Sequence, residues 1–239
     1  MIFLALTETW LRNHSDAEIN IDNYTIFRTD RDRVKKRYGR NSGGTAIYIK
    51  NELAASTEVL LRLSDGTNEV LGVHIKQLNL VTFILYRPPV TPSDGPTPPG
   101  QGFEKVLQEV DAKLDSLPVP MPYIMIMGDF NLPKSRWPHC TPTPGATLLE
   151  KRILSLLGDL SDKFFLQQVV DKPTHKAGNT LDLLFTNCPS LLLNHEVFPT
   201  TPISSHNLVE FTTVLNCDSS TQDETTQPKS LFDQADLRS

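Results

Sequence analysis

The stretch of sequence that decides the fold is YIMIMGDFNLP, residues 123–133. Its first part, Tyr123 to Met127, is a continuous apolar run, which predicts a strand buried on both faces of a sheet. The run ends in glycine, aspartate, asparagine and proline, and these are the common turn formers. A turn alone would explain them, so the rest of the chain decides whether this strand end also carries a function.

The composition indicates one soluble globular domain. With 239 residues, 38% of them hydrophobic and 21% charged, the chain is long enough for a single large domain. No stretch approaches the roughly 20 apolar residues that cross a bilayer, and the N-terminus lacks the basic region of a signal peptide. Three scattered cysteines suit neither a disulfide framework nor a zinc cluster, which favours a reducing, intracellular setting. The net charge of -5 argues against nucleic-acid binding through global charge.

Apolar runs separated by turn signals predict more strands than helices. Strands are expected over residues 1–7, 45–50, 69–75, 80–86, 123–127, 166–170, 180–186, 195–198 and 207–215. Helical spacing of apolar residues predicts helices over 103–117 and 147–157, and the Pro- and Gly-rich segment 87–102 is an irregular loop. The domain therefore spans residues 1–215, with helices available to cover sheet faces. Residues 216–239 are polar and are expected to form a linker or disordered tail.

A basic run lies between Arg28 and Arg40. Seven cations stand there against Asp30 and Asp32: Arg28, Arg31, Arg33, Lys35, Lys36, Arg37 and Arg40. Such a run usually forms a solvated loop. The alternative is a local contact with the phosphate backbone of a nucleic acid, which gains weight only if the chemistry elsewhere in the chain concerns phosphates.

Polar residues stand where predicted buried strands stop or turn. They are Glu8, Asp129, Asn131, Asp182 and His206. Each one alone has a structural explanation, such as a solvated carboxylate or a hydrogen-bonded core histidine. Together they suit phosphodiester hydrolysis, because carboxylates at strand ends can hold Mg²⁺ and an aspartate can deprotonate the attacking water. A histidine paired with an aspartate can neutralise the pentavalent phosphorane.

Six ordered motifs carry a family resemblance. In chain order they read LTETWL, GGTAIYIK, YRPP, MGDFNLP, TLDLLFTN and SSHNLVEF. They resemble the motifs of the endonuclease/exonuclease/phosphatase superfamily, which includes DNase I, and more narrowly those of the endonuclease domains of non-LTR retrotransposons. The resemblance covers nearly the whole chain up to residue 215. It implies an α/β fold, namely a DNase I-like four-layer sandwich of two packed mixed β-sheets with flanking helices.

The resemblance also implies the catalytic residues, which are Tyr86, Asp129, Asn131, Asp182 and His206. Tyr86 corresponds to a tyrosine that contacts the scissile phosphate. Asp129 corresponds to the aspartate that activates water, and Asn131 to its orienting partner. Asp182 corresponds to the partner of the catalytic histidine, which is His206.

Cofactor and partners follow from the same resemblance. Mg²⁺ is the expected metal, with Mn²⁺ as a substitute, and Glu8 is its expected ligand. DNA is the expected substrate, and Thr174 would lie near it. The basic residues expected to contact its phosphates are Arg28, Arg31, Arg33, Lys35 and Lys36. A reverse transcriptase domain is expected downstream in an intact polyprotein, no membrane association is expected, and the resemblance alone suggests a nuclear location.

Two departures from the family pattern lower the expected activity. The family begins with a further strand and helix ahead of LTETWL, so the chain is expected to be an N-terminally truncated copy whose first strand has an unpaired edge. Ser205 stands where the family has an aspartate beside the histidine, and a hydroxyl is the weaker ligand for Mg²⁺. The expected function is therefore Mg²⁺-dependent hydrolysis of DNA at a reduced rate. Two alternatives stay open: a catalytically inactive remnant that at most binds nucleic acid, and a phosphatase or lipid phosphodiesterase of the same superfamily.

Overall fold

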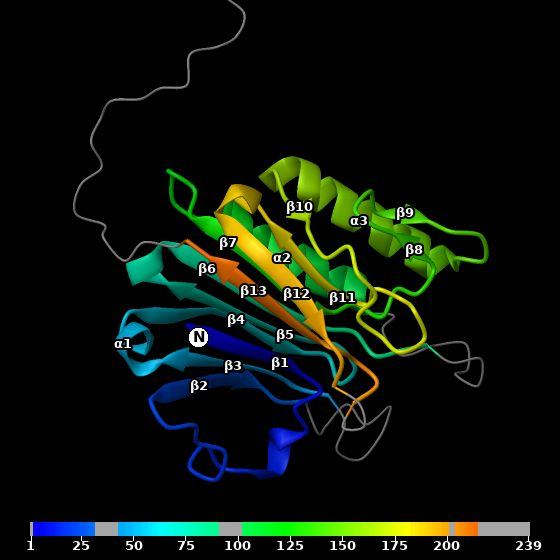
Figure 1. Ribbon diagram of the computed structural model, residues 1–239. Helices are drawn as coiled ribbons and strands as arrows, with labels where there is room; N and C mark the ends of the chain where they lie inside the picture. Colours follow the sequence, from blue (N-terminus) through cyan, green and yellow to red (C-terminus); the bar gives the residue numbers. More distant parts are fainter. Residues whose placement is uncertain (1, 32–42, 91–101, 201–203, 215–239) are drawn as a thin grey trace, which may run out of the picture.

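A mixed sheet forms the centre of the protein (Figure 1). The computed structural model describes residues 2–31, 43–90, 102–200 and 204–214. Six strands of these residues pair in the order β10-β11-β7-β6-β5-β4; β6 and β7 run parallel, and the other neighbours are antiparallel. In chain order they are β4 (Thr57–Ser64), β5 (Glu69–Ile75), β6 (Leu80–Tyr86), β7 (Tyr123–Asp129), β10 (Gln167–Gln168) and β11 (Asp182–Thr186).

Two amphipathic helices cover the outer face of this sheet (Figure 1). They are α2 (Phe103–Asp115) and α3 (Leu148–Phe164), and their apolar stripes pack against strand side chains such as Phe83 and Ile126. α3 begins with a capping box, in which the Thr147 hydroxyl accepts a hydrogen bond from the Glu150 N–H at 3.1 Å. The Glu150 carboxylate accepts one from the Thr147 N–H at 2.7 Å. The first turn of α3 is therefore fixed by its own side chains.

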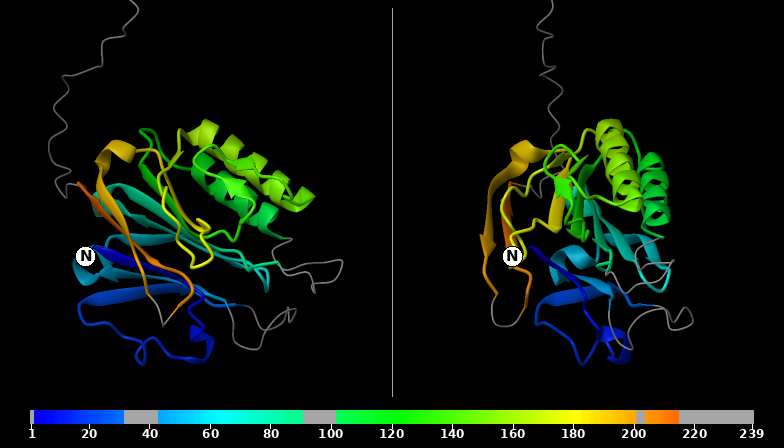
Figure 2. Two further views of the ribbon diagram at one scale, coloured as in Figure 1. Left: turned by 45° about the vertical axis from the view of Figure 1, so that its right-hand side comes forward. Right: turned by 90° about the vertical axis from the view of Figure 1, so that its right-hand side faces the viewer.

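A second layer covers the inner face of the central sheet. It contains a three-stranded antiparallel sheet, in the order β1-β3-β2, and a hairpin of β12 with β13. Figure 2 shows the helices, the central sheet and this layer one behind another. Apolar side chains of β3 and β5, Ile47 and Leu71 among them, fill the space between the layers. The strands are β1 (Phe3–Thr7), β2 (Tyr24–Thr29), β3 (Thr45–Lys50), β12 (Leu192–Phe198) and β13 (Leu208–Thr213).

Short elements connect these layers. They are α1 (Asn51–Ala54), the pair β8 (Ser135–Arg136) and β9 (Thr141–Pro142), and 3₁₀ turns over Leu11–Asn13, Lys76–Leu78 and Pro189–Leu191. Within the described ranges, no helix is both long enough and apolar enough to cross a membrane.

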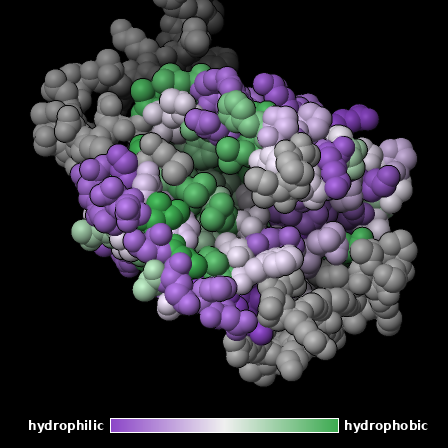
Figure 3. Space-filling view, turned by 60° about the horizontal axis from the view of Figure 1, so that its bottom comes forward, coloured by the Kyte–Doolittle hydropathy of each residue, from purple (hydrophilic) through white to green (hydrophobic). Residues whose placement is uncertain are grey.

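An apolar groove runs between β1 and β13 in the second layer. Among the described residues β1 pairs with β3 alone and β13 with β12 alone, so each strand has one unpaired edge. The groove has a volume of about 710 Å³, and Ile84, Met127 and Leu184 of the central sheet contribute to its lining. The ring centroids of Phe3 and Phe211 lie 5.9 Å apart. Figure 3 shows apolar residues gathered around a hollow on one face of the molecule.

The α/β class with two packed layers of sheet is confirmed, and the details differ from expectation in a few places. The groove divides the second layer, and both long helices lie on the central sheet. β2 and β4 were not predicted, because charged residues such as Arg28 and Arg62 interrupt their apolar pattern. The predicted tail over 216–239 lies outside the described residues.

Candidate active site

A row of polar side chains crosses the central sheet near one end. Glu69 of β5 is paired with Tyr86 of β6, Tyr86 with Asp129 of β7, and Asp129 with Asp182 of β11. Residues directly opposite each other on neighbouring strands project from the same face of a sheet. Four strands therefore place one tyrosine and three carboxylates in a single line. The sequence showed that polar residues stand at strand ends, but it could not show that these residues are aligned across the sheet.

The turn after β7 holds the carboxylate of Asp129. Gly128 has φ 135°, and a Cβ added there would lie 1.9 Å from the Leu85 carbonyl oxygen, so glycine is required at this close approach. Asn131 is in the left-handed region and donates its N–H to Asp129 Oδ1 at 3.1 Å and its Nδ2–H to Oδ2 at 2.7 Å. The sequence GDFN therefore forms a turn, as its composition predicted, and the same turn also fixes the buried carboxylate of Asp129.

Arg87 supports the same turn through hydrogen bonds with Asn131. It is 1% exposed, and its Nη1 donates to the Asn131 carbonyl oxygen at 2.7 Å. In return, Asn131 Nδ2 donates to the Arg87 carbonyl oxygen at 2.7 Å. Burial lowers the pKa of Arg87 to about 10. Sequence reasoning gave this residue no role, although it belongs to the motif YRPP.

A histidine connects the last two carboxylates of the row. His206 Nδ1 lies 2.9 Å from Asp182 Oδ2, and His206 Nε2 lies 3.8 Å from Asp129 Oδ2. The hydrogen bond to Asp182 raises the pKa of His206 to about 9 against the opposing effect of burial, and the charges of Asp182 and Asp129 add to the rise. Burial, followed by the charge of Asp182, raises the pKa of Asp129 well above its ordinary value. The imidazole is therefore a cation at neutral pH.

The segment before β11 supports this histidine. Thr174 is fully buried, and its hydroxyl accepts hydrogen bonds from the N–H groups of Leu181 (3.0 Å) and Asp182 (2.9 Å). The ring of His175 meets that of His206 edge-on, with centroids 4.9 Å apart. The structure thus places Thr174 behind Asp182, where it positions the start of β11. His175 was not singled out from the sequence, although it follows Thr174 in the motif KPTH.

Glu8 lies at the other end of the site, directly after β1. Its backbone is left-handed, with φ 51°, and its Oε1 accepts a hydrogen bond from the Tyr86 hydroxyl. Burial, together with this hydrogen bond to Glu8, raises the pKa of Tyr86. Tyr86 therefore joins Glu8 of the second layer to the row of the central sheet.

The two described cations of the basic run bind within the protein. Arg28 pairs with Asp16 at 2.9 Å and donates to two backbone carbonyl groups. Arg31 is 6% exposed, and its Nε donates to Glu69 Oε1 at 2.7 Å, so its guanidinium group is engaged inside the protein. The other predicted phosphate contacts, Arg33, Lys35 and Lys36, lie outside the described residues.

Several of these groups suit a hard divalent cation. Ligand atoms of Asp129, Asp182 and His206 lie within 4.8 Å of one another. Glu8 does not belong to this group but reaches Tyr86, the neighbour of Asp129 in the row. Carboxylate oxygens are the ligands that Mg²⁺ prefers, and a cation would compensate the charge of Asp182, which adds to the effect of burial in raising the pKa of Asp129. Ser205, next to His206, offers only a hydroxyl.

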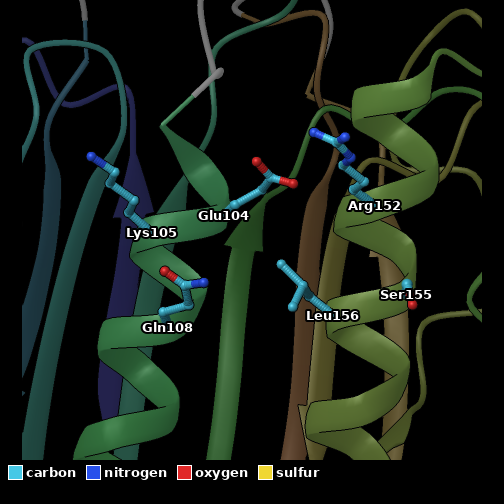
Figure 4. A pocket seen from close by; sticks show the side chains of 6 residues that line it. All are labelled: Glu104, Lys105, Gln108, Arg152, Ser155 and Leu156. Carbon is cyan, nitrogen blue, oxygen red and sulfur yellow. The ribbon is translucent and has the colours of Figure 1, made fainter.

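A separate hollow lies on the helical layer (Figure 4). It has a volume of about 420 Å³ and is lined by residues of α2 and α3. None of the residues of the polar row contributes to this lining. The chemistry of the described residues therefore concentrates at the end of the sheet rather than between the helices.

Comparisons with known proteins give one family match for the sequence and several solved structures of similar fold. The profile of the endonuclease/exonuclease/phosphatase family matches residues 3–206. The endonuclease domain of TRAS1, a telomere-specific non-LTR retrotransposon, superposes with a TM-score of 0.54 and 14% identity over 90% of this chain and 86% of that one. An AP endonuclease from Archaeoglobus fulgidus gives 0.59 and 13% identity over 89% and 88%. A 3′ phosphatase from Neisseria, bound to a product DNA hairpin, gives 0.57 and 12% identity over 88% of each chain. No curated protein matches the sequence.

Proposed function

This chain belongs to the endonuclease/exonuclease/phosphatase family, and from that premise we propose that it hydrolyses phosphodiester bonds of DNA with Mg²⁺, Mn²⁺ acting as a substitute. The observation that carries the proposal is the contact of His206 with Asp182 at 2.9 Å and with the buried Asp129 at 3.8 Å. A cationic imidazole beside a buried carboxylate supplies, in one place, a proton acceptor and a positive charge.

Asp129 is the proton acceptor in this proposal. Burial and the charge of Asp182 raise its pKa, and a carboxylate with a raised pKa is a stronger proton acceptor. The two hydrogen bonds from Asn131 keep its carboxylate oriented. The water oxygen forms the new bond to phosphorus and gives one proton to Asp129, while the bond to the leaving oxygen breaks and that oxygen takes a proton from solvent.

His206 stabilises the charge that develops on phosphorus-bound oxygens. Its pKa of about 9 keeps it protonated at neutral pH, and the hydrogen bond from Nδ1 to Asp182 fixes the ring. Preorganised charge of this kind lowers the barrier because it needs no rearrangement during the reaction. The Tyr86 hydroxyl, at the next position of the row, is the proposed contact to the scissile phosphate.

Glu8 is the proposed metal ligand. A bound Mg²⁺ would neutralise phosphate charge and act as a Lewis acid. The carboxylate of Glu8 is held by the Tyr86 hydroxyl, so a cation there would lie beside the proposed phosphate contact. Ser205 offers a weaker ligand than a carboxylate, and among the described residues β1, the strand that leads to Glu8, is paired on one side only. We therefore propose a lower rate than in a relative with a carboxylate at that position.

DNA is the proposed substrate class. The wording of the motifs LTETWL, YRPP and MGDFNLP supports the retrotransposon branch of the family, in which a reverse transcriptase domain follows the endonuclease. A similar structure, the Neisseria 3′ phosphatase, is described as bound to DNA. At this level of identity such likeness concerns the fold, so the substrate rests on the motifs.

A plasmid-nicking assay tests the proposal. Supercoiled plasmid with Mg²⁺ should be nicked slowly by the wild type, and Asp129→Asn and His206→Ala should each lower the rate by roughly 10²–10⁴-fold. His195→Ala is the matched control, because His195 also pairs with an aspartate, Asp171, at 3.0 Å but lies outside the row. Nicking that survives both active-site substitutions would overturn the proposal. Hydrolysis of phosphomonoesters or phospholipids without nicking would favour the other branch of the family.

A further inference from the structure

A ring of contacts connects the buried ion pair of Arg31 and Glu69 to Glu8. We propose that this ion pair is a positioning device that holds Glu8 and Tyr86 in the geometry required for the cation and the phosphate. The inference rests on the proposed function, because it assigns a role to two residues that support the proposed metal ligand. Neither residue would touch substrate, so both are positioning residues.

The ion pair itself is rigid and buried. Arg31 Nε and Nη2 donate to the two carboxylate oxygens of Glu69 at 2.7 and 3.1 Å, and Nη2 also donates to the Thr67 carbonyl oxygen at 2.6 Å. Glu69 is fully buried. A bidentate pair fixes both planes, because two parallel hydrogen bonds allow only one relative orientation. Removing one partner would leave the other charge uncompensated in the interior.

One side of the ring runs through Tyr86. The guanidinium carbon of Arg31 lies 5.6 Å from the centroid of the Tyr86 ring, over its face. Tyr86 is the strand partner of Glu69, and its hydroxyl donates to Glu8. A cation over the ring face attracts the ring and so favours one position of the whole side chain, including its hydroxyl. The ion pair therefore determines where the Tyr86 hydroxyl meets Glu8.

The other side of the ring runs through Gly43 and Gly44. Glu69 Oε2 accepts a hydrogen bond from the Gly44 N–H at 3.2 Å. The carbonyl oxygens of Gly44 and Gly43 accept from the N–H groups of Thr9 (3.3 Å) and Trp10 (3.0 Å), the two residues after Glu8. Glu69 thus reaches the backbone around Glu8 through a second, independent path.

Glycine is required on this path. A Cβ at Gly43 would lie 2.4 Å from the Arg31 guanidinium, and a Cβ at Gly44 would lie 2.5 Å from the Thr9 hydroxyl. Both residues have positive φ, 86° and 96°. The motif GGTAIYIK therefore makes space for the ion pair and presents the carbonyl groups that hold the segment after Glu8. A pair needed for stability alone would not require two connections, one to the Glu8 carboxylate through Tyr86 and one to the backbone directly after Glu8.

A double-mutant cycle tests the assignment. Arg31→Met and Glu69→Gln should each raise the Mg²⁺ concentration for half-maximal nicking by roughly 10–100-fold, the usual cost of losing a residue that supports a metal ligand. In the Tyr86→Phe background the effect of Arg31→Met should be clearly smaller, because one of its two paths to Glu8 is already broken. Arg31→Lys, which keeps the charge but loses the bidentate contact, should restore part of the Mg²⁺ affinity.

The control is Leu157→Ala, a substitution on the buried face of α3. It destabilises the fold, and Leu157 does not belong to the ring of contacts around Arg31 and Glu69. It should leave the half-maximal Mg²⁺ concentration unchanged. If it moves this concentration as far as Arg31→Met does, or if Arg31→Met leaves it at the wild-type value, the assignment is wrong. If Arg31→Met does not fold, the half-maximal Mg²⁺ concentrations of Glu69→Gln and Arg31→Lys are compared with the wild-type value instead.

A second readout separates this inference from the proposed function. Mg²⁺ that binds only the native state raises the melting temperature, and this shift requires no catalysis. A wild type that does not nick DNA but shows the shift would overturn the proposed function only, and the shift should then weaken in Arg31→Met and Glu69→Gln. A wild type with neither nicking nor a shift up to millimolar Mg²⁺ would overturn both.

Discussion

Asp129 and Asp182 occupy directly opposite positions on β7 and β11, and the imidazole of His206 lies between their carboxylates. Burial raises the pKa of Asp129, and the charge of Asp182 at the neighbouring position adds to the rise. The pKa of His206 is also raised, to about 9, chiefly by its hydrogen bond to Asp182, and a raised pKa favours the charged form of a histidine. The three groups therefore form one electrostatic unit, in which a substitution of one changes the protonation of the others.

Asp182→Asn should impair catalysis more than it impairs folding. The amide cannot stabilise the imidazolium, so we expect the nicking rate to fall by about 10²-fold or more at neutral pH. The measurement is the initial rate with saturating plasmid and Mg²⁺. Asp171→Asn is the matched control, since Asp171 holds His195 in an exposed pair. Equal losses in the two variants would contradict the role given to Asp182.

The stability contributed by His206 should depend on pH. Its folded-state pKa of about 9 lies above the ordinary 6.5, so the folded state binds the proton more tightly than the unfolded state does. The contribution is therefore fully present below pH 6.5 and is lost as the pH rises through about 9. Urea unfolding without divalent cations should show His206→Gln less stable than wild type by roughly 1–3 kcal/mol at pH 6, with a much smaller difference above pH 9. His195→Gln serves as the control, and a difference that grows with pH would contradict the sign.

Gly128→Ala should be among the most damaging single substitutions. The new Cβ would meet the Leu85 carbonyl oxygen at 1.9 Å in a backbone with φ 135°, so the pairing of β6 with β7 must open. We expect a loss of about 3 kcal/mol or more in the free energy of unfolding. Gly158→Ala in α3 is the control, because nothing lies within 4 Å of its Cβ position. That variant should gain up to about 1 kcal/mol from helix propensity, and equal destabilisation of the two variants would refute the argument.

Thr147→Ala should weaken the start of α3. The substitution removes the hydroxyl that accepts the Glu150 N–H and breaks half of the capping box. The expected cost is about 1 kcal/mol in the free energy of unfolding, read from the urea midpoint at constant slope. Ser155→Ala, at an exposed position in the middle of the same helix, should cost nothing. No change in Thr147→Ala would show that packing against the sheet alone fixes this end of the helix.

The strands of the central sheet were predictable because burial on both faces leaves a clear pattern. The predicted bounds of β5 and β6 agree with the structure residue for residue, as do those of β3, the buried middle strand of the second layer. β7 continues two residues further than its apolar run, because Gly128 and Asp129 still pair with β6. β4 was missed because it lies at the edge of the sheet, where exposed charges such as Glu58 and Arg62 are tolerated.

The candidate site was predictable only as far as local sequence describes it. Asp129, Asn131, Asp182 and His206 stand at strand ends or turns. The structure brings them together because β7 and β11 are neighbours and because the segment before β13 places His206 against Asp182. Arg87 and His175 were missed, since a buried arginine and a second histidine carry no pattern of their own.

By itself, the sequence determined the family of this protein, the strands of its core and the polar groups at their ends, because these depend on residues close together in the chain. Only the tertiary structure decided the place of Arg31. Within the basic run it looked like a solvated cation, yet it is buried against Glu69, 38 residues further along the chain. Arg31 follows β2 of the second layer and Glu69 lies on β5 of the central sheet, so their contact depends on how the two layers pack, and the local pattern of charge around Arg31 contains no record of that packing.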